Sequence, residues 1–215
     1  MKVQDFLEAV KAGDIPLVEE MIDRDPARVN AKDGSGVSAI LLAIYYGRPE
    51  IAELLIVRGA QLDGFEAAAA GRVDRMRALL EEDAALANAY APDGFQPLGL
   101  ASFFGHKPVV DLLLSCEAEV NSASKNGQRV MPLHSAVAGG HTEIARTLLE
   151  RGADANARQA GDFTPLHGAA QNGQMEMVEL LLAFGADKSA QSANGQTPRS
   201  IALENGHGEV ANLLR

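Results

Sequence analysis

The chain has 215 residues, of which 47% are hydrophobic and 22% charged, and its net charge is −10. Because such an acidic chain repels phosphate groups, we expect it to bind neither nucleic acid nor anionic membranes. The single cysteine, Cys116, excludes an internal disulfide and a thiolate metal cluster. At the amino terminus, Asp5 and Glu8 interrupt any apolar run, so we predict no signal peptide and a cytoplasmic location.

Seven short segments rich in small and apolar residues recur along the chain, each with a glycine at or near its end. In chain order they cover residues 6–14 (FLEAVKAGD), 38–48 (SAILLAIYYGR), 65–72 (FEAAAAGR), 96–106 (QPLGLASFFGH), 131–141 (MPLHSAVAGGH), 164–174 (TPLHGAAQNGQ) and 197–207 (TPRSIALENGH). Their glycines are Gly13, Gly47, Gly71, Gly105, Gly140, Gly173 and Gly206, at intervals of 34, 24, 34, 35, 33 and 33 residues. We predict a first helix ending at each glycine and a second apolar helix after it, as in residues 143–157.

The last three segments also share a helix-start signal. Pro132, Pro165 and Pro198 suit the first helical turn, where a missing N–H costs nothing, and Thr164 and Thr197 precede two of them as caps. The TPLH pattern and its 33-residue period closely resemble the ankyrin-repeat family, and the resemblance covers essentially the whole chain. It implies an all-α fold, a solenoid of stacked helix-turn-helix units with β-hairpin fingers.

The resemblance makes residues 1–215 a single domain of about seven repeats, including a cap at each end. The repeats cover approximately residues 1–30, 31–60, 61–88, 89–121, 122–156, 157–189 and 190–215. Between repeats two and three, only about four residues, Gln61 to Gly64, replace an entire finger. We therefore predict that one finger is missing there, which explains the short interval between Gly47 and Gly71.

Histidines and carboxylates are present, but not in a pattern typical of catalysis or metal binding. His134 and His167 belong to the TPLH motif, whose histidine in this family hydrogen-bonds to neighbouring backbone. His106, His141 and His207 fall in separate stacked helices, about 8–10 Å apart, and so cannot converge on one zinc ion. We predict no catalytic residue, no metal site and no cofactor.

Aromatic side chains mark the surface on which we expect a partner to bind. The family resemblance implies that binding uses the finger tips and the two residues before each repeated glycine. The candidate partner-binding residues are therefore Val37, Tyr45, Tyr46, Phe95, Phe103, Phe104, Phe163, Gln171 and Asn172.

Two aromatic pairs, Tyr45–Tyr46 and Phe103–Phe104, flank the small pair Ala69–Ala70 in the repeat without a finger. Aromatic walls on an alanine floor would form a notch that is open on one side. Four such side chains cover roughly 600–1,000 Å², more than the ~300–600 Å² apolar patch of a typical monomer. Either they bind a partner, or they fold inward and fill the space left by the finger; one of each pair packed inward is a third arrangement.

The function that these patterns favour is a non-catalytic protein–protein interaction module. It would act as an adaptor, scaffold or inhibitor and bind an unidentified protein or peptide through its concave face and fingers. The alternative is a small-ligand receptor or enzyme that uses the aromatic notch, with Asp63, Glu66 and Arg72 as the nearby polar groups. We expect a monomer, although self-association would also cover the notch. Asn121 and Asn156, at repeat ends, either cap the following turn or are targets of an asparagine hydroxylase.

Overall fold

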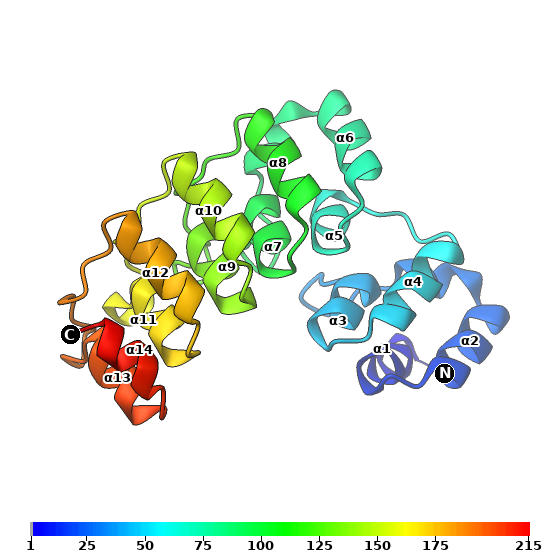
Figure 1. Ribbon diagram of the computed structural model, residues 1–215. Coiled ribbons are helices and arrows are strands. Elements are labelled where there is room, and N and C mark those ends of the chain that lie inside the picture. The colour runs from blue at the N-terminus through cyan, green and yellow to red at the C-terminus, as the bar shows by residue number, and fades with distance from the viewer. Residues whose placement is uncertain (1) are drawn as a thin grey trace.

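The computed structural model describes residues 2–215 as an arch of stacked helix pairs (Figure 1). The first helices of the pairs are α1 (Val3–Ala12), α3 (Ala39–Tyr45), α5 (Gly64–Ala69), α7 (Pro97–Phe103), α9 (Pro132–Gly139), α11 (Pro165–Gln171) and α13 (Pro198–Glu204). The second helices are α2 (Ile15–Arg24), α4 (Pro49–Val57), α6 (Val73–Glu82), α8 (Lys107–Ser115), α10 (Thr142–Glu150), α12 (Met175–Ala183) and α14 (Gly208–Leu213). Three 3₁₀ turns complete the helical elements: η1 (Pro26–Asn30), η2 (Ala84–Asn88) and η3 (Ala160–Asp162). Within residues 2–215, no helix has the length and apolar character needed to cross a membrane.

The glycines that end the first helices are required by two independent features. Gly105 has a φ of +82°, a left-handed conformation that side-chain-bearing residues rarely adopt. A Cβ atom on Gly105 would also lie 2.5 Å from the ring of His141, and one on Gly173 would lie 2.5 Å from the ring of His207. At Gly71, Gly105 and Gly173 the glycine therefore also permits the close approach of the next repeat, whereas at Gly47 and Gly206 only the positive φ requires it.

A repeated hydrogen bond explains why a histidine so often follows the glycine. The side chain that begins each second helix reaches the backbone of the preceding repeat: Arg48 to Lys11 O, His106 to Ala69 O, His141 to Phe103 O, Gln174 to Val137 O and His207 to Gln171 O, at 2.9–3.1 Å. Arg72 holds this position at the junction between α4 and α5. Its guanidinium pairs with Glu53 instead, and its buried Nε has no hydrogen-bond partner within residues 2–215.

Asparagines near the repeat ends form a second set of bonds between repeats. The side chain of Asn156 donates to Gly185 O at 2.9 Å and accepts from Asp187 N at 2.7 Å. Asn121 makes the equivalent pair of bonds with Gly152 O and Asp154 N. Both amides therefore hold the loop of the following repeat.

The hydrophobic core is divided at the same α4–α5 junction. The smaller cluster of buried side chains lies in α1 to α4 and their loops, and includes Phe6, Met21 and Leu55. The larger cluster extends from α5 to α14, with Leu41 of α3 joining it. Within residues 2–215, the partly buried side chains that pack against both clusters are those of Val37, Ile44 and Leu62. Figure 1 shows the corresponding separation between α4 and α5–α6.

The loops between helix pairs are turns, and the expected β-hairpin strands are not found in residues 2–215. The β pairing in this range is one isolated bridge, between Lys32 and Ser38. Each loop is closed by very few bonds, such as Ala91 N to Phe95 O at 2.8 Å, too few to sustain a two-stranded ribbon in water. Residues 58–63 connect α4 to α5. That this connection replaces a lost finger stays a prediction.

Candidate functional site

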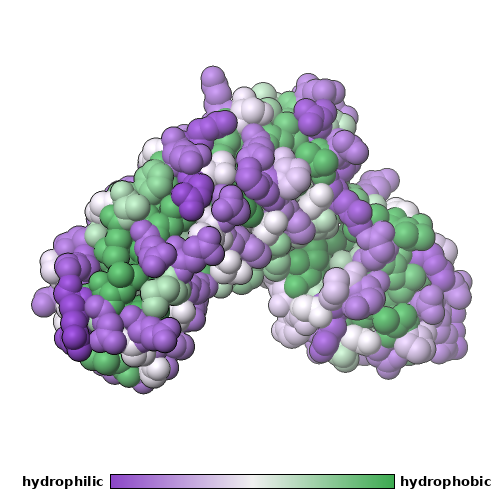
Figure 2. Space-filling view, viewed as in Figure 1, coloured by the Kyte–Doolittle hydropathy of each residue, from purple (hydrophilic) through white to green (hydrophobic). Residues whose placement is uncertain are grey.

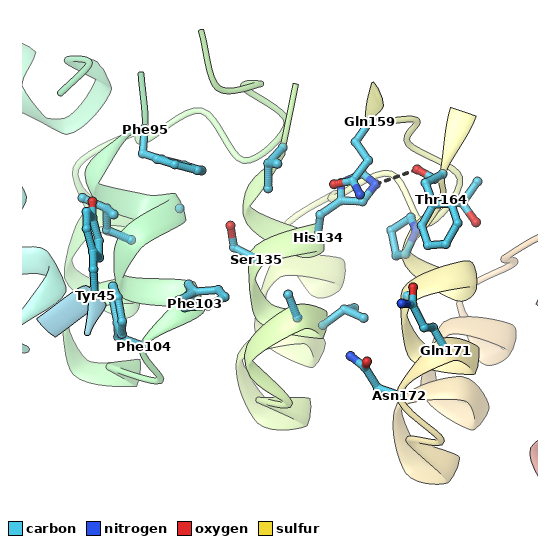
Figure 3. A pocket seen from close by; sticks show the side chains of 18 residues that line it. Tyr45, Phe95, Phe103, Phe104, His134, Ser135, Gln159, Thr164, Gln171 and Asn172 are labelled. Atoms are coloured by element: carbon cyan, nitrogen blue, oxygen red, sulfur yellow. Dashed lines mark hydrogen bonds between the residues drawn. The ribbon is translucent and has the colours of Figure 1, made fainter. Parts of the chain in front are cut away.

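A groove of about 700 Å³ crosses α7, α9 and α11. Figure 3 shows it from close by, with aromatic side chains at one end and amides at the other. The lining residues are Tyr45, Phe95, Gly99, Leu100, Phe103, Phe104, Val130, His134, Ser135, Val137, Ala138, Gln159, Phe163, Thr164, Pro165, Gly168, Gln171 and Asn172. Hydrophobic surface also appears in the hollow of the arch in Figure 2.

At the aromatic end, three rings support one another. The Tyr45 and Phe104 rings stack with centroids 6.0 Å apart, and the Phe103 and Phe104 rings are perpendicular with centroids 5.0 Å apart. The Tyr45 hydroxyl donates to Asp93 Oδ2 at 2.5 Å, and burial together with this carboxylate raises the pKa of Tyr45. Tyr45 is nevertheless 38% exposed and Phe103 44% exposed. This end therefore presents ring surface to solvent with its one hydroxyl already bonded.

On the α11 side of the groove, Gln171 and Asn172 lie at the end of α11, and Gln159 lies on the loop before it (Figure 3). The ring of Phe163, which packs against His167 of α11, lines this side as well. Gln171 and Asn172 are exposed, and Gln159 is partly buried. None of the three side-chain amides forms a hydrogen bond within residues 2–215. Each thus offers an unused donor and an unused acceptor to a molecule in the groove.

The groove contains no charged side chain. Its titratable histidine, His134, is buried, and its Nε2 lies 3.2 Å from Phe163 O. Burial lowers the pKa of His134 to about 4, so the ring is neutral at physiological pH. The lining side chains are therefore uncharged, and the Asp93 carboxylate bonds the Tyr45 hydroxyl at the aromatic end.

Most of the candidate residues from the sequence come together in this groove. Its lining includes the predicted Tyr45, Phe95, Phe103, Phe104, Phe163, Gln171 and Asn172. Two predicted residues lie elsewhere. Tyr46 is exposed, with Lys11 Nζ 5.8 Å from its ring centroid, and Val37 is half-buried between the two core clusters.

The predicted notch is not open between its two aromatic walls. Tyr45 reaches across the small α5 helix and stacks on Phe104, so the walls touch. Behind this contact lies a second cavity of about 330 Å³, lined by Ala69 and Ala70 among others. The groove is instead displaced toward α9 and α11, because the alanines are small enough to let Tyr45 cross.

Sequence reasoning missed several lining residues, and one signal was available for some of them. Gly99 stands where the TPLH repeats have histidine, and a Cβ there would meet only Ser135 Oγ, at 3.8 Å. The absent side chain leaves Gly99 open to the groove. Val130 and Gln159 come from loops, whose positions no helical period specifies.

The polar groups considered for a small-ligand or catalytic site are engaged in structure. Glu66 is buried, and burial raises its pKa. It accepts from Asp63 N at 2.7 Å, Asp63 in turn caps α5, and Glu66 lines neither cavity. Arg72 pairs with Glu53 at the smaller cavity. Within residues 2–215, no three His, Cys, Asp or Glu side chains are arranged to hold a metal ion.

Comparisons with known proteins agree with the repeat architecture. A family model described as ankyrin repeats (3 copies) matches residues 64–159 and 133–215, and one described as ankyrin repeats (many copies) matches residues 6–56. The chain is 31% identical over 157 residues to ankyrin repeat and SAM domain-containing protein 6 of Rattus norvegicus, covering 73% of this chain and 15% of that protein. It is 47% identical over 60 residues to ankyrin repeat and KH domain-containing protein 1 of Homo sapiens, covering 28% of this chain and 2% of that protein.

The chain thus corresponds to a small part of these relatives, and the similarity concerns their repeats. The matches to the three-copy model extend over more than half of the chain. The stacked helix pairs of the structure agree with these matches to repeat models. The chain belongs to the ankyrin-repeat family.

Proposed function

We propose that this protein is a non-catalytic binding module that holds a partner protein or peptide in the groove across α7, α9 and α11. In this proposal it acts as a monomeric adaptor, scaffold or inhibitor through its concave face and loops. The protein would be one ankyrin domain of seven repeats that lacks a finger between the second and third. Its partner-binding residues would be those of the nine candidates that line the groove.

The observation that carries this proposal is the exposed aromatic surface beside unpaired amides. Phe103 is 44% exposed although Ser102 before it is buried, and the side-chain amides of Gln171 and Asn172 form no hydrogen bond within residues 2–215. Apolar ring surface and unpaired polar groups in one concavity are what a protein partner covers at an interface. An enzyme would instead require ionisable groups converging in the cavity, and the groove has none that is charged.

Site-specific photo-cross-linking tests the proposal. A photoreactive amino acid replaces Ala138, which lines the groove, and in a control protein it replaces Glu150, an exposed residue of the second helix α10. We expect a discrete adduct from native lysate with the groove probe and none with the α10 probe. The adduct should disappear when Phe103→Ser is added.

Phe184→Ser is the matched control, because Phe184 is 40% exposed and lies outside the groove. It should leave the adduct unchanged. If the groove probe forms no discrete adduct, or if the adduct survives Phe103→Ser, the groove is not the binding site.

A further inference from the structure

We propose that the groove takes an extended, uncharged polypeptide segment, with an apolar side chain at its aromatic end and backbone amides against Gln159, Gln171 and Asn172. This inference rests on the proposed function and specifies the chemistry of the partner. It follows from the neutrality of the groove, the state of its aromatic end and the unpaired amides at its other end.

The neutrality of the groove selects an uncharged occupant. No Asp, Glu, Lys or Arg is among its lining residues. A charged side chain that entered would lose hydration and find no opposite charge among the lining residues, which is unfavourable. An acidic, basic or phosphorylated segment is therefore a poor match, although the surface of the chain as a whole is acidic.

The aromatic end of the groove favours an apolar side chain on the bound segment. The one polar atom that the rings of this end carry, the Tyr45 hydroxyl, already donates to Asp93 at 2.5 Å. The Phe103 ring is perpendicular to that of Phe104 and remains 44% exposed. An aliphatic or aromatic side chain removes this ring surface from water, whereas a polar one would gain no hydrogen bond there.

The amide end distinguishes an extended segment from a helix. The peptide groups of an extended chain have free N–H and C=O groups on both sides, and a side-chain amide matches both. In a helix these groups are already bonded to one another, except at its ends. The backbone of a docked helix would thus offer the three side-chain amides no hydrogen-bond partner. The backbone of an extended chain offers them both N–H and C=O groups.

The length of the groove sets the length of the segment. It crosses from α7 past α9 to α11, which is two helix spacings, or roughly 16–20 Å. At about 3.3 Å per residue, an extended chain spans this distance with five or six residues. The segment is therefore short enough to belong to a loop or a flexible tail of the partner.

A random phage-displayed 12-residue peptide library, selected on the full chain, tests this inference. We expect enriched sequences with a core of five or six uncharged residues that includes a large apolar side chain. A fluorescein-labelled synthetic copy of the most enriched peptide is then measured by fluorescence anisotropy. The double variant Gln171→Leu/Asn172→Leu should weaken its binding by about tenfold or more, because buried peptide groups lose their partners.

Asn212→Leu is the matched control, since Asn212 is an exposed amide on α14 outside the groove, and it should leave the affinity unchanged. N-methylation of the peptide backbone within the uncharged core should also reduce binding. Enrichment of charged cores, a helical bound peptide by NMR, or equal affinity for both Leu variants and the wild type would overturn the inference. Enrichment of no peptide, while the Ala138 adduct persists, would also overturn it and leave the proposed function standing with a folded surface as partner.

Discussion

The ring of Tyr45, at the end of α3, stacks on the ring of Phe104, which follows α7, with centroids 6.0 Å apart. Helix α5 lies between α3 and α7 in the stack, so this contact links helices on either side of it. It joins α3, which belongs to the smaller core cluster, to α7, which belongs to the larger one. At this junction Arg72 does not make the hydrogen bond to the preceding backbone that the equivalent residues of other repeats make.

We therefore expect Tyr45→Ala to destabilise the protein by roughly 2 kcal/mol, less than the 3–5 kcal/mol typical of a fully buried aromatic. Tyr45→Phe keeps the stack and loses only the bond to Asp93, and should cost about 0.5–1.5 kcal/mol. Urea unfolding of Tyr45→Ala, Phe104→Ala and the double variant gives the coupling energy, which should be about 0.5–1.5 kcal/mol. A coupling near zero would show that the rings touch without stabilising the junction.

The division of the core predicts unequal stability along the stack. The stability of a solenoid is approximately the sum of the stabilities of its repeats and of the interfaces between them. At the interface between α4 and α5–α6, Arg72 pairs with Glu53 and makes no hydrogen bond to the backbone of the preceding repeat. Hydrogen exchange measured by mass spectrometry should show that α1 to α4 open at a lower free energy than α7 to α11. Equal protection in both parts would mean that the half-buried Val37, Ile44 and Leu62 make the two clusters one cooperative unit.

Substitution of Gly105, which follows α7, should lower the free energy of unfolding through a steric clash as well as through backbone strain, and the two effects can be separated. Gly105→Ala introduces a Cβ at positive φ and 2.5 Å from His141. Gly152→Ala is the control, because its φ is also positive, at +88°, but nothing lies within 4 Å of the new atom. The control should cost about 1–2 kcal/mol for the backbone alone. Thermal or urea unfolding should show about 1–3 kcal/mol more for Gly105→Ala.

The buried histidine of the groove predicts a dependence of stability on pH. Burial lowers the pKa of His134 to about 4, below the ordinary value near 6.5 that it regains on unfolding. Between these values the unfolded chain binds the extra proton, so this histidine's contribution is present above pH 6.5 and is lost as the pH falls toward 4. The loss should reach about 3 kcal/mol, from ~1.36 kcal/mol per pKa unit.

Urea unfolding of His134→Gln and wild type at several pH values isolates this contribution from those of the carboxylates. The slope between pH 6.5 and 4 should be shallower in His134→Gln. Phe184→Ser, which changes no titratable group and lies outside the groove, should retain the wild-type slope. If the His134 variant keeps the full slope, protonation of that ring does not limit stability in acid.

The sequence predicts the helix pairs well because their signals are local. Proline at the first turn, threonine caps and a left-handed glycine act within a few residues, so the period of Gly105, Gly140 and Gly173 locates the helices. The loops are less predictable. Whether a short loop forms strands depends on how many pairs it can bond, and the described loops bond too few.

The site was predictable only in part, because it depends on the reach of side chains between repeats. The family pattern selects Phe103 and Gln171 as surface positions, and both line the groove. It does not reveal that Tyr45 would cross α5 to Phe104, which closes the expected notch. Nor does it reveal that Gln159, on a loop, would line the groove.

Tyr45 has a thermodynamic consequence beyond its local contacts. It belongs to the helices with the smaller core cluster, yet it lines a groove built mainly from α7, α9 and α11. A ligand in the groove therefore touches both parts, and its binding energy favours their docked arrangement. Conversely, any fraction of molecules in which α1 to α4 swing away lowers the apparent affinity in proportion. Because binding and docking are linked, the affinity measured for the groove depends on α1 to α4 remaining docked. Of the side chains in these helices, that of Tyr45 lines the groove.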